Sequence, residues 1–288
     1  MSLKYDLHSH STASDGSWCP EELVKMAGRQ QVDVLALTDH DTTAGITEAM
    51  QAAASQGLKF IPGVEISVSW RKQTVHIVGL NIDPSCKLLQ QGLEKLRGFR
   101  DWRAEEIGRK LEKSGVNNAL EGARAYAKGS LITRTHFAHY LVEKGLAKDV
   151  RDVFKKFLIR NKPGHVAGQW ADLDQAVGWI RSAGGQAVIA HPARYRMTST
   201  KLKKLISDFV ECGGECIEVV SSSHSRDERH IMAGFARTYG LHASCGSDYH
   251  GPENPWVHLG KFADFPEGCT PVWESERWKA PTEISVLR

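Results

Sequence analysis

The sequence predicts an α/β protein built on a parallel sheet or barrel, and two observations support this fold class. Short apolar runs rich in β-branched residues alternate with helical patterns along most of the chain. Most of these runs are apolar throughout, which is typical of strands that are buried on both faces. Because strand and helix alternate, the architecture is α/β. A third observation, an interruption of this alternation between about residues 97 and 165, predicts an inserted lobe.

Each apolar run is expected to form a strand, and a shorter strand is expected at the N-terminus, over 6–10. The longer runs lie at 32–38, 59–69, 74–80, 186–192, 215–221 and 241–248.

The helices between the strands are predicted from their first and last residues. Pro20 and the two acids after it favour a first helical turn, and Gly57, Gly184 and Gly240 are typical helix ends. The predicted helices cover 20–30, 43–56, 172–183 and 226–239.

The segment 97–165 contains helical patterns at 98–115, 133–145 and 149–164 without a credible strand. It carries 16 lysines and arginines against 8 acidic residues, whereas the rest of the chain carries 21 against 26. We therefore expect a barrel formed by 1–96 and 166–288 and a basic helical insertion that binds substrate. Such a division of charge suits a phosphate-rich substrate, although a solvated helical surface would also explain many of the lysines.

The totals of the 288-residue sequence indicate an ordinary globular protein. No apolar run approaches the ~20 residues of a membrane span, and the N-terminus lacks the pattern of a signal peptide. We expect a cytoplasmic protein that needs no membrane and no obligate protein partner. The six cysteines are scattered without a C-x-x-C spacing, so we expect reduced, mainly structural thiols.

Side chains that can bind metals lie at or near the ends of the predicted strands. His8 and His10 are two residues apart on a predicted strand and therefore face the same side. Asp15 lies in a turn that can fold back towards them. A single histidine is usually a hydrogen-bonded structural residue, but nine such ligands are improbable by chance. The others are His40, Glu65, His76, His191, Asp248 and His250.

Nine nitrogen and oxygen ligands exceed what one ion requires, since a single zinc takes about four. The set suits two or three divalent ions, with Mn²⁺ favoured and Fe²⁺ or Zn²⁺ as alternatives. Such clusters lower the pKa of a bound water towards ~7 and hold the attacking and leaving oxygens of a phosphoryl displacement. The sequence therefore predicts hydrolytic chemistry.

The ordered motifs DLHSHSTASDG, LTDHDT, PGVEIS, HIVG, AHP and GSDYH resemble the polymerase and histidinol phosphatase (PHP) family of metal-dependent phosphoesterases. The insertion looks like that of its nucleoside 3′,5′-bisphosphate phosphatase and 5′-to-3′ exoribonuclease subgroup. The resemblance implies a distorted, TIM-like β/α barrel with three ions. By this resemblance, the first ion is held by His8, His10, Glu65 and Asp248, the second by Asp15, His40 and His250, and the third by Glu65, His76 and His191. Glu65 would then be a bridging ligand.

Four residues are expected to bind substrate. Arg134 lies at a predicted helix start, where an arginine fork and free N–H groups can grip a phosphate. Arg194 follows His191 and is expected to act with His191 and Glu65 at the reacting phosphate. His136 and Lys162 are weaker candidates that also fit a surface position.

The leading functional hypothesis is hydrolysis of the 3′-phosphoester of a nucleotide that carries a 5′-phosphate. The substrate would be a nucleoside 3′,5′-bisphosphate or a short 5′-phosphorylated RNA. Two alternatives stay open: a phosphatase of a small metabolite such as histidinol phosphate, and a non-catalytic, metal-stabilised RNA-binding module. The last twenty residues carry no recognisable chemistry.

Overall fold

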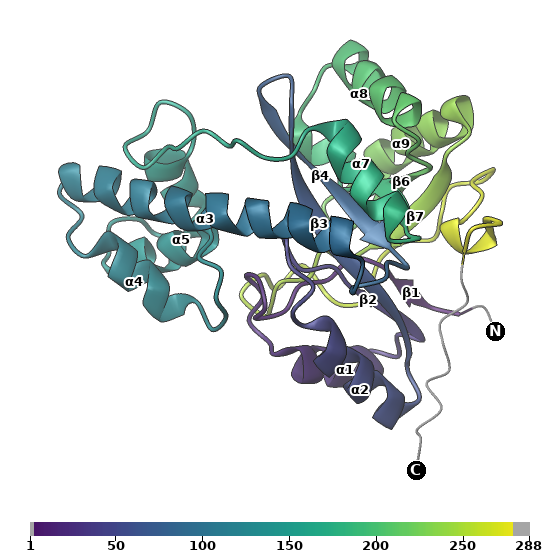
Figure 1. The fold of residues 1–288 in the computed structure, drawn as a ribbon, viewed down its shortest axis with the longest axis horizontal. Coiled ribbons are helices and arrows are strands. Elements are labelled where there is room, and N and C mark those ends of the chain that lie inside the picture. The colour runs from purple at the N-terminus through teal and green to yellow at the C-terminus, as the bar shows by residue number, and fades with distance from the viewer. Residues whose placement is uncertain (1–2, 279–288) are drawn as a thin grey trace.

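Seven strands form one curved sheet that is surrounded by helices (Figure 1). The computed structural model describes residues 3–278. The strands are neighbours in chain order: β1 (Tyr5–Asp6), β2 (Val34–Leu37), β3 (Lys59–Trp70), β4 (Gln73–Leu80), β5 (Gln186–Ile189), β6 (Cys216–Ser221) and β7 (His242–Gly246). The chain after β1 returns to β7, because the amide of Leu7 donates a 3.1 Å hydrogen bond to the carbonyl of Cys245. The sheet is thus a nearly closed barrel, which confirms the predicted fold class.

The helices on the outside of the barrel follow their predicted positions closely, with one addition. They are α1 (Pro20–Arg29), α2 (Ile46–Gln56), α7 (Leu173–Ser182), α8 (Ser199–Glu211) and α9 (Arg226–Tyr239), with the short 3₁₀ helices η2 (Pro192–Tyr195) and η3 (Val272–Glu274). The addition is α8, which buries Leu202, Leu205, Ile206 and Phe209. Their spacing is that of one helical face, so the sequence did contain this signal.

The sheet is not parallel throughout. β4 pairs antiparallel with both β3 and β5. The reversal occurs at a two-residue turn, where Arg71 and Lys72 both have positive φ, 45° and 64°. A turn of this kind joins antiparallel strands directly and needs no crossover helix. As a result, the first residues of β4 lie beside the last residues of β3.

The predicted strand over 6–10 is shorter than expected, because β1 ends at Asp6. The buried Asp6 carboxylate accepts hydrogen bonds from the amides of Ser247 and Gly260, at 2.8 and 2.7 Å. Beyond it, only Ser9 forms an isolated bridge, to Tyr249. The segment that carries the two histidines is therefore held by loops rather than by a regular strand.

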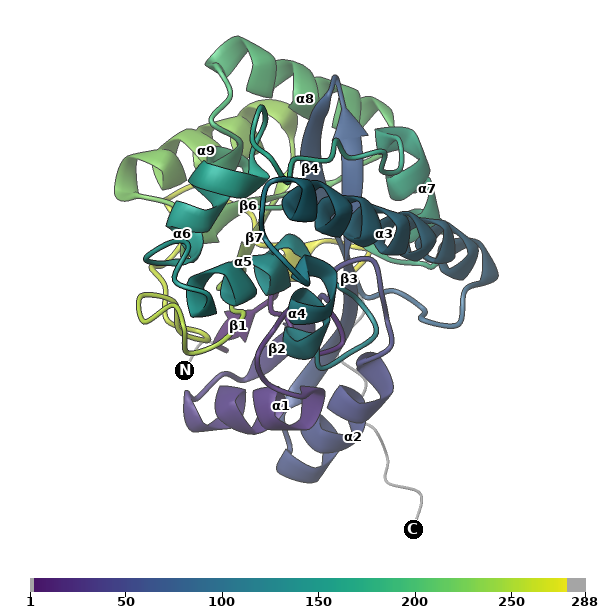
Figure 2. The ribbon, with the colours of Figure 1, turned by 90° about the vertical axis from the view of Figure 1, so that its left-hand side faces the viewer.

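The insertion is a helical lobe with its own hydrophobic core, which includes Ile107, Phe137 and Leu141. Its elements are α3 (Lys87–Lys113), α4 (Ala119–Tyr126), α5 (Arg134–Glu143), α6 (Val150–Val153) and the π-helical turn η1 (Phe154–Leu158). The lobe projects to the left of the barrel in Figure 1 and faces the viewer in Figure 2.

The predicted boundary before residue 97 falls inside α3, which begins ten residues earlier. The first turns of α3 contribute Leu89, Leu93 and Leu96 to the core of the barrel. Its later turns contribute Ile107 and Leu111 to the core of the lobe. One continuous helix therefore belongs to both parts of the molecule.

Within residues 3–278, no helix is both long enough and apolar enough to span a membrane. The part of the C-terminal segment that the structure describes packs on the barrel, where the rings of Trp273 and Tyr5 stack with centroids 3.8 Å apart. Residues 279–288, which complete the C-terminal stretch without recognised chemistry, lie outside the described residues.

Candidate metal centre and phosphate pocket

The nine predicted metal ligands lie together at one end of the barrel. Most of them follow strands at their carboxyl ends, the usual place of catalytic groups in β/α barrels. His76 comes instead from the first half of β4, and it reaches the same end because β4 runs antiparallel to β3. The antiparallel pair therefore brings His76 to Glu65, with 2.9 Å between Nδ1 and Oε1.

The carboxylate of Glu65 lies at the centre of the cluster and is completely buried. Its Oε1 lies 3.0 Å from Nε2 of His191 and 3.5 Å from Nε2 of His8. Its Oε2 lies 2.7 Å from Nδ1 of His40 and 3.4 Å from Nε2 of His10. Together with His76, five histidines from four segments of the chain surround this one carboxylate.

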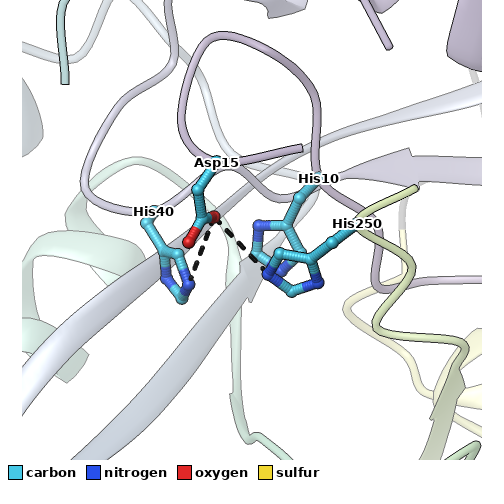
Figure 3. A group of neighbouring side chains, drawn as sticks. All are labelled: His10, Asp15, His40 and His250. Carbon is cyan, nitrogen blue, oxygen red and sulfur yellow. Dashed lines mark ion pairs between the residues drawn. The ribbon is translucent and has the colours of Figure 1, made fainter. Parts of the chain in front are cut away.

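Four overlapping groups of side chains bring their ligand atoms within 4.8 Å of one another. They are His10, Asp15, His40 and His250; His8, Glu65 and His191; His8, His10 and Asp248; and His40, Glu65 and His76. The first group, drawn in Figure 3, surrounds the carboxylate of Asp15, whose Oδ1 lies 3.4 Å from Nε2 of His250 and 3.8 Å from Nε2 of His40.

These groups differ in part from the grouping that the family resemblance implies. Asp15, His40 and His250 lie together as expected for the second ion, with His10 beside them. His76 and His191, expected to share the third ion, occur in different groups, each with Glu65. The difference concerns which ligands share an ion, since all nine residues are present in the cluster.

The nitrogen and oxygen atoms of the cluster are better suited to coordinating divalent cations than to forming hydrogen bonds with one another. Five of its buried atoms make no hydrogen bond: His10 Nδ1, Asp15 Oδ1, His191 Nδ1, and the atoms His40 Nδ1 and Glu65 Oε2, which lie 2.7 Å apart without hydrogen-bond geometry. Buried polar atoms are rarely left in this state, because each costs about 1–3 kcal/mol. Imidazole and carboxylate donors are suitable ligands for Mn²⁺, Fe²⁺ or Zn²⁺, so bound cations would satisfy the cluster.

Burial and neighbouring charges set the protonation states in the cluster. Burial lowers the pKa of His10 to about 3 and that of His76 to about 4, so both rings are neutral near pH 7. Burial would also lower the pKa of His250, but the Asp15 carboxylate outweighs it and raises that pKa to about 9. Burial would raise the pKa of Glu65, yet His40 and His76 hold it well below its usual range. Because neutral imidazoles and ionised carboxylates are the forms that bind metals, His10, His76 and Glu65 are ready to bind, whereas His250 would release its proton when a cation binds.

Two buried carboxylates that the sequence analysis missed support the ligands. Glu218 accepts from Nδ1 of His8 and from the amide of His191, both at 2.5 Å. Asp39 accepts from the hydroxyls of Ser11 and Ser14, at 2.7 and 2.6 Å, and thereby holds the loop that carries Asp15. An acidic residue inside an apolar strand, as in CIEVVS, was the available signal for Glu218.

A pocket extends from the cluster to the lobe. Its lining includes three of the four residues of Figure 3, all but His10, together with other residues of the cluster and side chains of α3, α5 and η1. The lining residues are Asp15, His40, Ser67, Thr74, His76, Arg100, Arg103, Thr133, Arg134, Thr135, Phe154, Trp170, His191, Arg194, Asp248 and His250. At the metal end, the guanidinium of Arg194 forms an ion pair with Asp248. Arg194 therefore lies beside the predicted ligands, as expected.

Three arginines gather at the lobe end of the pocket, and only Arg134 was expected there. Arg100 is ion-paired with Asp41, at 2.6 Å, and donates to the hydroxyl of Ser67. Arg103 donates to the carbonyl of Val166, and burial together with Arg134 and Arg100 lowers its pKa to about 9. Burial and the charge of Arg100 also lower the pKa of Arg134.

In the described part of the chain, this lobe end carries positive charge that no ion pair offsets. Within residues 3–278, no carboxylate forms an ion pair with Arg103 or Arg134. The ring of Phe154 lies under the guanidinium of Arg134, 5.3 Å from it, and fixes its orientation. Two partly desolvated guanidinium groups without counter-ions favour a doubly charged ligand such as a phosphate.

The two weaker substrate-binding candidates do not line the pocket. His136 is buried, and its Nδ1 accepts a 3.1 Å hydrogen bond from the amide of Thr133, so it caps the start of α5. Lys162 is exposed on the turn after η1. Neither position is evident from the sequence, because a capping histidine and a substrate-binding histidine have the same spacing from Arg134.

The fold and the site together define an α/β-barrel protein with a buried histidine and carboxylate cluster that can hold metal ions, beside an arginine-lined pocket. The PHP domain family model matches residues 6–167, which is more than half of the chain. The chain belongs to the PHP family.

The relatives extend over nearly the whole chain. It is 49% identical over 269 residues to a 3′,5′-nucleoside bisphosphate phosphatase of Chromobacterium violaceum, covering 93% of this chain and 94% of the relative. It is 46% identical over 279 residues to the 5′-3′ exoribonuclease Rnm of Escherichia coli, covering 96% and 94%.

Two solved structures are similar as well. An amidohydrolase from Chromobacterium violaceum, with bound sulfate and no metal, has a TM-score of 0.92 at 47% identity and covers 97% of this chain and 99% of its own. A putative metal-dependent phosphoesterase from Bifidobacterium adolescentis has a TM-score of 0.83 at 26% identity, covering 92% and 93%.

Proposed function

We propose that this protein is a metal-dependent phosphoesterase that hydrolyses the 3′-phosphoester of nucleotides carrying a 5′-phosphate. The observation that carries the proposal is the pocket with two differently built ends. One end holds the buried His and carboxylate cluster, and the other holds Arg103 and Arg134 without counter-ions. A substrate with two phosphates separated by a nucleoside would use both ends.

Two substrates fit this description. A nucleoside 3′,5′-bisphosphate would yield a 5′-monophosphate, and a short RNA with a 5′-monophosphate would be trimmed from its 5′ end. The relatives named a 3′,5′-nucleoside bisphosphate phosphatase and 5′-3′ exoribonucleases support both. A metabolite with a single phosphate, as in the histidinol phosphatase alternative, would leave the arginine end unused.

Two or three divalent ions, manganese being the first choice and Fe²⁺ or Zn²⁺ the alternatives, would be held by the nine clustered residues. When bound, such ions lower the pKa of water and stabilise the charge that develops on a reacting phosphate. Glu65 would serve several ions because it contacts five histidines. Arg194 would add positive charge at the reacting phosphate, and His191 would be one of the metal ligands there.

Recognition of the 5′-phosphate is assigned to the lobe, residues 97–165, and hydrolysis to the barrel. We further propose that the protein acts in the cytoplasm, which the six free cysteines support.

Comparing substrates with and without the 5′-phosphate tests the proposal. Losing a charge-assisted contact costs about 1.5–3 kcal/mol, so Arg134→Ala should lower kcat/KM on a 3′,5′-bisphosphate about tenfold to a hundredfold. Hydrolysis of a simple aryl phosphate should stay nearly unchanged. Arg124→Ala, which removes an exposed arginine of the same lobe, is the matched control and should behave as the wild type. Equal cleavage of 5′-hydroxyl substrates by the wild type would refute the assignment of the arginine end.

A further inference from the structure

The lobe contacts the loop that carries Asp15 at three points. Nζ of Lys128 donates a 3.0 Å hydrogen bond to the carbonyl of Ser17. Gly129 packs so closely on the carbonyl of Thr12 that a Cβ there would lie 2.3 Å from it. The third contact is to the Asp15 carboxylate itself.

Two hydroxyls at the start of α5 donate to the same oxygen of Asp15. Oγ1 of Thr133 and Oγ1 of Thr135 each lie 3.2 Å from Oδ2. The other oxygen, Oδ1, has no hydrogen-bond partner and lies 3.4 Å from His250 and 3.8 Å from His40. The two oxygens of one buried carboxylate thus have separate surroundings. The lobe hydroxyls contact one oxygen, and the histidines drawn in Figure 3 lie beside the other.

We propose that Thr133 and Thr135 are positioning residues that hold Oδ2 of Asp15 and so direct Oδ1 to the metal position between His40 and His250. The lobe then completes the metal centre as well as binding substrate. This inference rests on the proposed function, because it assumes that the Asp15 group holds a cation. Hydrogen bonds from outer groups to ligands commonly change metal affinity by about 10- to 100-fold.

An alternative role for the hydroxyls is direct contact with substrate, since both threonines line the pocket. The two roles differ in a measurable way. A positioning role affects metal binding in the absence of substrate, whereas a substrate contact does not.

Thr135→Val is the informative variant, because valine keeps the shape of threonine and removes the hydroxyl. It also leaves the cap of α5 in place, since the amide of Thr135 still donates to Oγ1 of Thr133. Thr135→Ser keeps the hydroxyl and is the rescue variant. Thr74→Val is the matched control, because Thr74 lines the same pocket without a contact to Asp15.

The experiment titrates Mn²⁺ into each metal-free protein and follows free Mn²⁺ by electron paramagnetic resonance. For Thr135→Val we expect one ion of the wild-type set to bind about tenfold more weakly. Thr135→Ser and Thr74→Val should bind as the wild type does. The phosphoesterase activity of Thr135→Val should recover at high Mn²⁺.

Wild-type Mn²⁺ affinity in Thr135→Val, or lost activity that excess Mn²⁺ does not restore, would overturn the inference and assign the hydroxyl to substrate. A wild-type protein that binds no ion at all would instead refute the proposed function. The two failures are therefore distinguishable.

Discussion

Glu65 contacts more of the histidine cluster than any other carboxylate, so its charge affects several ligands at once. We predict that Glu65→Gln lowers metal content and activity more than His250→Ala does. Glutamine preserves the size of the side chain, and therefore the loss reports on the charge. Metal analysis of both purified variants, together with their phosphoesterase rates, checks this. Equal losses of metal and activity in the two variants would contradict a shared role for Glu65.

Arg194 lines the pocket and pairs with Asp248, and under the proposed function it acts on the charge of the substrate. We predict that Arg194→Ala lowers kcat by about tenfold or more while the metal content stays at the wild-type level. Arg196→Ala removes an exposed arginine two residues further on and should leave kcat unchanged. If metal is lost along with activity, Arg194 instead holds Asp248 in place.

The nine clustered residues could be predicted from sequence because each lies at or near a strand end, where side chains of different strands converge. Glu218 was marked only as an acidic residue inside an apolar strand, and nothing in its spacing shows that it will face His8. The roles of Arg100 and Arg103 in the pocket could not be recognised from sequence for a different reason. They lie among 16 basic residues of the lobe, most of them on its surface, and only the three-dimensional structure separates buried arginines from solvated ones.

At the scale of elements, α3 can be tested through two of its glycines. Gly92 packs against α7, and a Cβ there would lie 2.5 Å from the ring of Trp179, whereas Gly98 has nothing within 4 Å. We predict that Gly92→Ala lowers the free energy of unfolding by about 1–3 kcal/mol through overpacking. Gly98→Ala should raise it by about 0.5–1 kcal/mol through helix propensity.

Urea unfolding of both variants, followed by circular dichroism, measures the difference. A stabilised Gly92→Ala protein would show that α3 and α7 can separate without cost, contrary to their packing.

Among the elements, β4 is the one whose direction the sequence analysis had wrong, because a parallel sheet was expected and β4 is antiparallel to both neighbours. Its apolar run looks like that of any buried strand, and the reversal depends on the short turn at Arg71 and Lys72 rather than on the run itself. A two-residue connection is too short for the crossover that parallel strands need, so the length of the turn was the feature that indicated an antiparallel pair.

For the whole molecule, metal removal should affect stability as well as activity. A ligand that binds only the folded state at 100 times its Kd adds about 2.7 kcal/mol to the free energy of unfolding. We predict that a chelator lowers the melting temperature and abolishes phosphoesterase activity, and that added Mn²⁺ restores both. Differential scanning calorimetry with and without chelator checks this.

The Glu65→Gln variant is the control for this measurement and should show a smaller shift in melting temperature. An identical melting temperature of the wild type with and without chelator, in active protein, would argue against buried metal sites.

The helix α3 runs without a break from the core of the barrel to the core of the lobe. Its length therefore sets how the lobe, with its arginines, is rotated relative to the barrel, with its histidine cluster. Each residue of an α-helix advances by about 1.5 Å and turns by about 100°. A single deletion between Leu96 and Ala104 would therefore swing the lobe about a quarter turn around the helix axis. The number of residues along this stretch is therefore a dimension of the site.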